Sequence, residues 1–175
     1  MRTDLVFTLT GTDRVGLVEE VTGVLLGVGG NVETSRMARL GGEFAMLVLV
    51  SLPAERVTAA QSALAHLTDA GYRVSFSETN PDAATELAGW RPYRVAVHGA
   101  DHEGIVHEVA SGLSKRGITI ESMETGVSSA PVSGVTLFDM SAVVLVPPAV
   151  VAGDWIDVLV EAGHQANVDV EIEPA

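Results

Sequence analysis

The sequence predicts an α+β protein with two ferredoxin-like domains in tandem, each an antiparallel sheet with helices on one face. The first observation is an internal repeat, because the stretch 8–37 recurs in the second half at 97–125. The repeated positions lie 88 residues apart and mix turn, core and charged types: Gly11 and Gly99, Asp13 and Asp101, Gly16 and Gly104, Val21 and Val109, Leu25 and Leu113, Glu33 and Glu121. The second observation is that periodic segments in both copies read β-α-β-β-α-β. Third, 175 residues suffice for two such domains.

We expect the first domain at residues 1–78, a linker at 79–91 and the second domain at 92–175. The linker contains proline, aspartate and glycine, which are typical of turns and connections. A domain of about 80 residues buries little more than half of its unfolded surface, so it is marginally stable alone. We therefore expect the copies to pack on each other or on another chain, as in a homo-oligomer.

The first strand and helix of copy one are predicted from hydrophobic spacing. Leu5, Phe7 and Leu9 alternate with less apolar residues, as in a strand with one face in the core. Gly11 is expected to end this strand. A helix begins at Gly16, with apolar residues at helical spacing on one face: Leu17, Val18, Val21, Val24, Leu25 and Val28. Gly29 and Gly30 follow, where a left-handed C-cap is favoured.

The rest of copy one follows the same logic. Val32 opens a second strand, and Gly41–Gly42 predicts a hairpin turn. Residues 44–52 are nearly all apolar, which predicts a central strand buried on both faces. A second helix is expected from Pro53 to Gly71, and a fourth strand at 72–76.

Copy two is predicted to contain a helix at 103–115, a strand from Ile118, a strand at 135–146, a helix at 151–162 and a strand at 168–172. Its third strand matches copy one at a shift of 94, so six residues have been added near 128–134. These residues are polar turn formers. The sequence leaves two interpretations open, a tolerated surface insertion or a contact for a partner.

Composition excludes several functional classes. The chain has 10 basic and 23 acidic residues, a net charge of −13 and no basic run, which argues against direct contact with nucleic acid. No apolar run is long enough for a membrane span, and the N-terminus lacks the pattern of a secretory signal. The chain has no cysteine, which suits a reducing compartment. We expect a cytoplasmic protein without membrane contact.

The turn between the first strand and the first helix is the candidate binding element. The first N–H groups of a helix lack internal partners and carry the positive end of the helix dipole, so they can receive a carboxylate. Gly16 and Gly104 have no Cβ and allow a ligand to approach the backbone. Asp13 and Asp101 allow two interpretations, since each could cap the helix or face a ligand ammonium group.

These motifs resemble the ACT domain, a small regulatory module that binds amino acids between copies of itself. The family's turn reads Asp-Arg-Pro-Gly followed by an aliphatic residue, with an Asn opening the second strand. Copy one matches with Asp13, Arg14, Gly16, Leu17 and Asn31, while Val15 replaces the proline. Two such domains without a catalytic domain, and the Phe-Asp-Met at 138–140, resemble the glycine cleavage system transcriptional repressor group.

The resemblance implies a ligand site in copy one formed by Asp13, Arg14, Val15, Gly16, Leu17, Asn31 and Val32. It implies a weaker second site at Asp101, His102, Gly104, Ile105 and Thr119. In that copy Glu103 puts a negative charge where a ligand carboxylate would lie, and Thr119 lacks the amide of Asn31. One working site and one decayed site is the resulting hypothesis. The implied ligand is an amino acid such as glycine or serine.

Two other classes remain open. A metal-dependent enzyme could use His98, His102 and His107, but copy one has Thr10, Arg14 and Glu19 at these positions. Motifs for a serine nucleophile elbow and a phosphate loop are absent, so we expect neither catalysis nor a cofactor. A ligand-independent adaptor would use only strand pairing between copies. We expect an amino-acid-sensing regulator that contacts a protein partner, such as a transcription factor or a metabolic enzyme.

Overall fold

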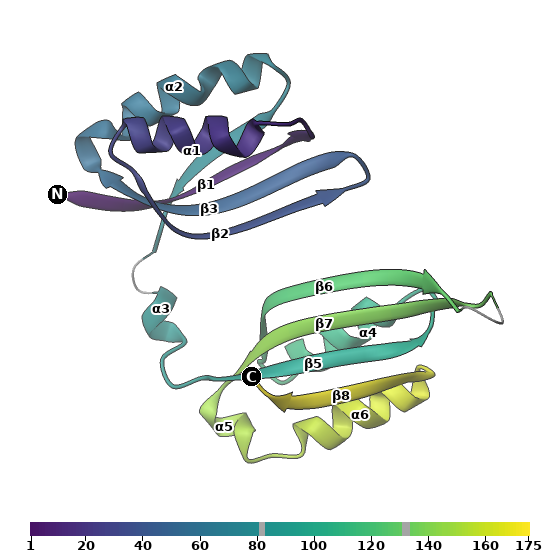
Figure 1. Cartoon of the computed structure of the whole chain (residues 1–175). Coiled ribbons are helices and arrows are strands. Elements are labelled where there is room, and N and C mark those ends of the chain that lie inside the picture. The colour runs from purple at the N-terminus through teal and green to yellow at the C-terminus, as the bar shows by residue number, and fades with distance from the viewer. Residues whose placement is uncertain (81–82, 131–133) are drawn as a thin grey trace. The chain divides into compact units, whose positions relative to one another are not determined.

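The computed structural model describes residues 1–80, 83–130 and 134–175. The chain forms two compact units, 1–81 and 82–175. Each unit contains a four-stranded antiparallel sheet with helices on one face, in the order β-α-β-β-α-β (Figure 1). The predicted fold class is therefore confirmed for both copies.

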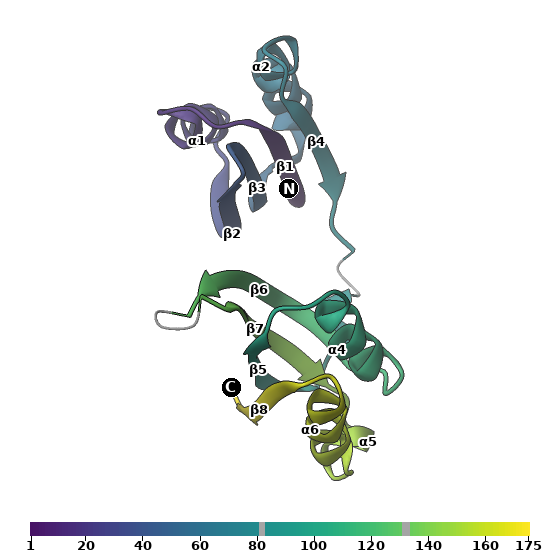
Figure 2. The ribbon, with the colours of Figure 1, turned by 90° about the vertical axis from the view of Figure 1, so that its right-hand side faces the viewer.

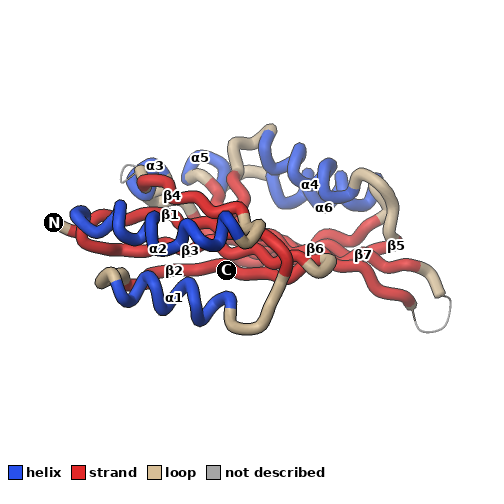
Figure 3. Tube along the Cα trace, turned by 90° about the horizontal axis from the view of Figure 1, so that it is seen from above, coloured by secondary structure: helices blue, strands red, loops and turns tan. Residues whose placement is uncertain are grey.

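In the first unit the two middle strands are the first and third in sequence, because the sheet order is β2-β3-β1-β4. Its two helices lie on the same face of this sheet (Figure 2) and run along its strands (Figure 3). The elements are β1 (Arg2–Thr12), α1 (Leu17–Gly27), β2 (Asn31–Leu40), β3 (Glu43–Pro53), a 3-10 turn (Ala54–Arg56), α2 (Val57–Asp69) and β4 (Arg73–Glu78).

The second unit repeats this arrangement with sheet order β6-β7-β5-β8. Its elements are α3 (Ala83–Glu86), β5 (Arg91–Ala100), α4 (Ile105–Ser114), β6 (Thr119–Ser129), β7 (Thr136–Val146), α5 (Pro148–Val151), α6 (Trp155–Gln165) and β8 (Val168–Pro174). The helix predicted at 151–162 begins later than expected, because α6 covers Trp155–Gln165 and a separate short helix, α5, ends at Val151. Residues 152–154 separate the two helices, and Trp155 is the first residue of α6. Only 2% of its surface is exposed, and its ring packs edge-on against Tyr93.

The core of each unit lies only between its sheet and its helices. In β3, Met46, Val48 and Val50 are buried, whereas Leu47 between them is 48% exposed. The prediction that this strand is buried on both faces is therefore wrong for the single unit. Within a unit the helices cover one face of the sheet, and alternate side chains of a strand point to opposite faces. The apolar residues of the second face remain available for contact.

Gly11 does not end the first strand, contrary to the prediction. β1 continues to Thr12, and Gly11 pairs with Phe44 of β3. A Cβ built on Gly11 would lie 2.5 Å from Cδ1 of Tyr72, which lies between α2 and β4. Gly99 is in the same situation, since its Cβ would lie 2.7 Å from Val168 at the start of β8. The glycine thus makes room for the segment after the second helix to close onto the first strand.

The glycine turns of copy one are confirmed. Gly41 and Gly42 both have positive φ and form the two-residue β2–β3 hairpin. At the end of α1, Gly29 has φ +79 and donates to Leu26, while Gly30 donates to Leu25. This is the Schellman pattern that satisfies the last carbonyls of a helix.

The six residues added in copy two extend the β6–β7 hairpin without changing its register. Ser128 pairs with Leu137, which corresponds to the pair Leu40–Glu43 next to the shorter hairpin turn. One further pair, Ser129–Thr136, lies beyond it. Of the predicted polar tip, residues 131–133 lie outside the described part of the chain.

We expect Gly11→Ala to destabilise the protein by about 1–3 kcal/mol, because the new methyl group overlaps the Tyr72 ring. Gly23→Ala is the matched control. Gly23 lies in the middle of α1 with open space around its Cβ, so alanine should stabilise the helix by about 0.5–1 kcal/mol. Chemical denaturation of both variants measures the two effects. Equal stability of Gly11→Ala and the unmodified protein would contradict the proposed steric role of Gly11.

Candidate functional site

The turn between β1 and α1 contains the first group of predicted site residues. Gly16 is the N-cap of α1, with a left-handed backbone at φ +87, and no side chain caps the helix. The capping role considered for Asp13 is therefore wrong. Its carboxylate accepts instead from Arg39 of β2, with Nε 2.9 Å from Oδ2. Asp13 is thereby fixed beside the edge strand and does not cover the start of the helix.

The start of α1 is open to a ligand. The N–H of Leu17 donates to the carbonyl of Arg14 at 3.4 Å, and that of Glu20 donates to the carbonyl of Gly16 at 2.9 Å. The N–H groups of Val18 and Glu19 have no partner within the helix, and no side chain caps them. A Cβ on Gly16 would meet nothing within 4 Å, so the space beside it is empty. Val15 is fully exposed, whereas Leu17 is 1% exposed and belongs to the core. Leu17 can therefore contribute only its backbone to a site here.

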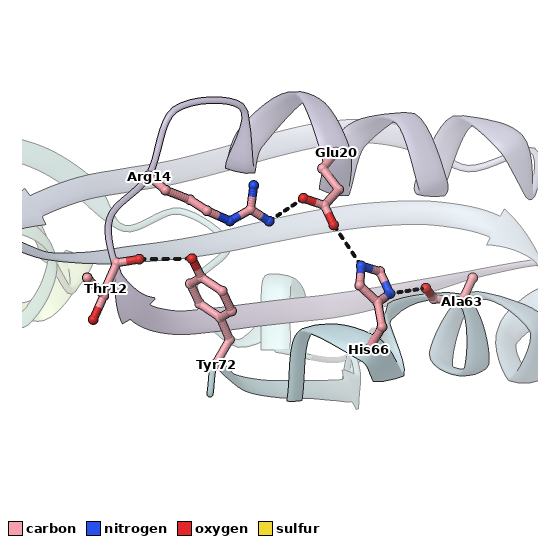
Figure 4. Close-up of polar contacts among 6 residues, drawn as sticks. All are labelled: Thr12, Arg14, Glu20, Ala63, His66 and Tyr72. Carbon is pink, nitrogen blue, oxygen red and sulfur yellow. Dashed lines mark hydrogen bonds and ion pairs between the residues drawn. The ribbon is translucent and has the colours of Figure 1, made fainter. Parts of the chain in front are cut away.

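A chain of polar contacts ties this turn to α2 (Figure 4). Arg14 forms an ion pair with Glu20 of α1, and its guanidinium lies 5.8 Å from the centre of the Tyr72 ring. Glu20 also contacts His66 of α2, with 2.7 Å between Oε1 and Nε2. The Tyr72 hydroxyl donates to the carbonyl of Thr12 at 3.0 Å. These contacts hold the turn against α2 and against Tyr72, which directly precedes β4.

The polar chain favours the protonated form of its histidine. Nε2 of His66 faces the Glu20 carboxylate, and Nδ1 lies 2.8 Å from the carbonyl of Ala63. Because both neighbours are acceptors, the doubly protonated ring satisfies both contacts. The Glu20 carboxylate first, and the Ala63 carbonyl second, raise the pKa of His66 above its ordinary value of 6.5. Hydrogen bonds from Arg14 and His66 lower the pKa of Glu20.

The predicted residues Asn31 and Val32 do not lie near the turn. Asn31 pairs with Ser51 of β3, and Ser51 pairs with Asp4 near the start of β1. The turn follows Thr12 at the other end of β1, which is eight residues or about 26 Å away along the strand. The amide of Asn31 donates to Glu33 at 2.7 Å. The seven predicted residues therefore form two groups at opposite ends of one sheet.

The second turn repeats the backbone of the first. Gly104 caps α4 with a left-handed backbone at φ +99. A hollow of about 530 Å³ lies here, lined by Asp101, His102, Gly104, Ile105, Val106, His107, Ala110 and Phe138. Ile105 is buried in the core with 2% exposed. Thr119 pairs with Leu145, opposite Pro92 at the far end of β5, so the second group is split like the first.

His102 replaces the arginine of the first turn and fastens the second turn in a similar way. Its Nδ1 lies 3.0 Å from the carbonyl of Glu103, and its Nε2 lies 2.6 Å from the carbonyl of Ala166 after α6. Both are acceptors, and they raise the pKa of His102 above its ordinary value. Arg14 and His102 thus both link their turn to the segment that follows the second helix.

The three histidines considered as metal ligands have other contacts or lie apart. His98 lies on the open sheet face, where Nδ1 is 2.7 Å from Asp139 of β7. His102 faces two carbonyl oxygens, and His107 lies on α4. Over the ranges 1–80, 83–130 and 134–175, no group of three or more His, Asp or Glu side chains could hold a metal ion.

Four residues at the first turn were not predicted from the sequence: Glu20, Arg39, His66 and Tyr72. Helical spacing places Glu20 outside the core but does not indicate its contacts with Arg14 and His66. Arg39 and His66 are 26 and 46 residues from their partners Asp13 and Glu20. No local pattern signals such contacts.

No helix in the described ranges is long and apolar enough to cross a membrane.

Comparison with known proteins places the first unit in a family. A model of the ACT domain matches residues 3–77. An unknown protein from Galdieria sulphuraria is 36% identical, and its crystal structure has a TM-score of 0.85 with 100% of this chain and 99% of that chain covered. The crystal structure of a candidate glycine cleavage system transcriptional repressor has a TM-score of 0.69 at 22% identity, covering 99% and 97% of the two chains. This last likeness shows a common fold.

Curated relatives from two organisms carry the same functional name. The glycine cleavage system transcriptional repressor of Escherichia coli (strain K12) is 40% identical over 60 residues, which cover 34% of this chain. The match spans 32% of that repressor, about a third of its length. Sequence similarity to the named protein is therefore limited to one part of each chain.

The Glu20–His66 contact predicts a pH-dependent stability. Since the folded state raises the pKa of His66, the stabilisation is complete below pH 6.5 and is lost as the pH rises through the higher pKa of the folded protein. We expect Glu20→Gln to lower the pKa of His66 toward its ordinary value. Glu19→Gln is the matched control, because it removes the same charge from α1 at a residue that does not contact His66. An NMR titration of the His66 ring protons measures both variants, and an equal pKa in both would contradict the assignment.

Proposed function

Because the first unit belongs to the ACT-domain family and the second unit repeats its fold, we propose that the chain is an amino-acid-sensing regulatory protein. In this proposal it acts in the cytoplasm on another protein, such as a transcription factor or a metabolic enzyme, by direct contact. With a net charge of −13, it would reach nucleic acid only through that partner. It carries out no catalysis and needs no cofactor.

The observation that carries this proposal is the open start of α1. A ligand carboxylate would accept from the uncapped N–H groups beside Gly16, where the helix dipole favours negative charge. Arg14, which forms an ion pair with Glu20, lies in the same turn and adds a guanidinium group. The ligand ammonium group would donate to Asp13. Arg39 contacts only Oδ2 of this carboxylate, and among the described residues no ion pair involves Oδ1. An α-amino acid carries both charges within one small molecule.

The separation of Asp13 from Asn31 within a unit implies that the complete site takes residues from two copies. β2 is an edge strand, and nearly all of its side chains are exposed. If two β2 strands pair antiparallel, the end of one lies beside the start of the other. This pairing would bring Asn31 and Val32 of one copy toward the Asp13 turn of its partner. We propose a homo-oligomer formed through this edge.

The surface beside β2 suits such pairing. Val18 of α1 is 39% exposed, and helical geometry turns it away from Glu20 and α2 toward the β2 side. Val32 and Met37 of β2 are also exposed apolar residues and lie on the helix side of the sheet, opposite Val50 and Met46. An edge strand with unpaired backbone groups and adjacent apolar side chains is a template for another chain.

Small amino acids such as glycine and serine are the proposed ligands. The E. coli relative is named for the glycine cleavage system, and its match to this chain supports glycine as the first candidate. The second turn is proposed as a weaker site, because His102 is fastened to two carbonyl oxygens and Glu103 adds a negative charge. Its hollow, lined by Asp101, Gly104 and Ile105, is nevertheless large enough for a small ligand.

An adaptor that binds no amino acid is the second candidate. Full exposure of Val15 favours it, since an apolar side chain at the tip of a turn suits contact with a protein. An adaptor would use the same edge strand and the same apolar surface. The two functions differ in whether a small ligand stabilises the fold.

We expect one small amino acid to raise the thermal stability of the whole chain. At 100 times its dissociation constant a ligand adds about 2.7 kcal/mol, which shifts the midpoint by several degrees. Asp13→Ala should abolish the shift, while Asp4→Ala, which removes the same charge at the other end of β1, should retain it. A thermal-shift screen of the amino acids measures this. If no amino acid raises the thermal midpoint, the amino-acid-sensing function is contradicted and the adaptor function is favoured.

Mixing two variants tests whether two chains build the site. Asp13→Ala and Asn31→Ala should each lose binding alone. In a dimer of one Asp13→Ala chain and one Asn31→Ala chain, one site has both residues changed and the other has both intact. Random exchange makes about half of the dimers mixed, so about a quarter of all sites should regain binding. Calorimetric titration of the separate and mixed variants measures the recovery. No recovery after subunit exchange would contradict a site shared between chains.

A further inference from the structure

A hollow in the open face of the first sheet lies outside the site described above. Its volume is about 560 Å³, within the range of pockets that bind small molecules. It is found where β1, β2 and β3 approach the Gly41–Gly42 hairpin, next to the start of β4. Its lining includes none of the predicted turn residues 13–17.

Strand register determines which side chains surround this hollow. Thr10 pairs with Ala45 of β3 on one side and with Arg73 of β4 on the other. Thr12 pairs with Glu43. Leu9 of β1 points into the core, so its alternate neighbours Thr10 and Thr12 point to the open face. The hollow therefore has two threonine hydroxyls between an arginine and a glutamate. Ala38 and Leu40 of β2 add an apolar wall.

The two charged residues do not neutralise each other. Among the described residues, neither Arg73 nor Glu43 forms an ion pair, and the one side-chain partner of Glu43 is the Thr12 hydroxyl at 3.5 Å. Arg73 and Glu43 are two strands and two residues apart, which corresponds to about 12 Å between their Cα atoms. They thus lie on opposite sides of the hollow with space for a small molecule between them.

The second unit shows that this pair of charges is not required by the fold. Its strand β8 places Asp169 opposite His98, where β4 of the first unit places Arg73 opposite Thr10. Leu137 pairs with Ala100, where Glu43 pairs with Thr12. His98 forms a hydrogen bond with Asp139 across this face. Two units of the same topology therefore differ at this place in the charges that a ligand would meet.

We propose that the hollow is a second binding pocket, specific to the first unit, for a small zwitterion with an apolar body. The carboxylate of the ligand pairs with the Arg73 guanidinium, and its ammonium pairs with the Glu43 carboxylate. The Thr10 and Thr12 hydroxyls lie between them and can donate or accept. Ala38, Leu40 and Ala45 contact the apolar body. This pocket is separate from the turn at Asp13–Gly16 and does not depend on the function proposed for that turn.

NMR titration of the whole chain tests the pocket, with L-leucine as the probe and N-acetyl-L-leucine and L-leucinamide as analogues that lack one charge. We expect L-leucine to shift the backbone signals of Thr10, Ala45 and Arg73 in a saturable manner. Each analogue should bind at least about tenfold more weakly, because one charge-assisted contact is lost. Unchanged affinity of either analogue, or no saturable shift at these residues, would overturn the proposal.

Variants separate this pocket from the turn. Arg73→Gln and Glu43→Gln should each weaken L-leucine binding by about tenfold or more. Asp169→Asn, at the corresponding position of the second unit, and Asp13→Ala, at the turn, should leave it unchanged. Both pocket residues are exposed, and a two-dimensional spectrum of each variant shows whether the fold is kept. Loss of binding in Asp13→Ala but not in Arg73→Gln would assign the ligand to the turn and overturn the proposal.

Discussion

The closure of the segment after the second helix onto the first strand is the contact on which each unit depends. Gly11 and Gly99 permit it, because any side chain there would overlap Tyr72 or Val168. Tyr72 in turn holds the end of β1 through the Thr12 carbonyl and lies beneath the Arg14 guanidinium. The same packing that completes the core therefore sets the position of the turn at the start of α1.

Each unit uses one face of its sheet for stability and leaves the rest of its surface for recognition. The helices bury alternate residues of β1 and β3 in one core. The turn, the edge strand β2 and the open face lie outside that core, so their residues can change without loss of packing. This is the physical reason that the candidate sites are formed largely by residues outside the core, whereas Leu17 and Ile105 at the same turns are fixed as core residues.

The two units share backbone geometry and differ in charge. Gly16 and Gly104 adopt the same left-handed N-cap, and Arg14 and His102 both fasten their turn to the segment after the second helix. The open faces diverge more, since Arg73 corresponds to Asp169 and Glu43 corresponds to Leu137. Duplication has therefore preserved the backbone of the unit while the charges on its surface diverged.

The sequence by itself determined the features that depend on neighbouring residues. The repeat, the strand and helix periods and the glycine turns at Gly16, Gly29 and Gly41–Gly42 follow from local sterics and hydrogen bonding, so the fold class could be predicted. The sequence also located the two turns, because a glycine before a helix is a local signal. It could not show that Gly11 lies inside a strand, since the reason is a ring 61 residues away.

Only the tertiary structure decided which distant residues meet. Asp13 pairs with Arg39 instead of capping its helix, and Asn31 lies at the opposite end of the sheet from the turn it was grouped with. The apolar strand β3 has one exposed face because two helices cover only one side of a sheet, which hydrophobicity alone does not reveal. Arg73 and Glu43 border one hollow because strand pairing joins segments far apart in the chain. Such contacts arise from chain topology, and no local pattern of residues encodes them.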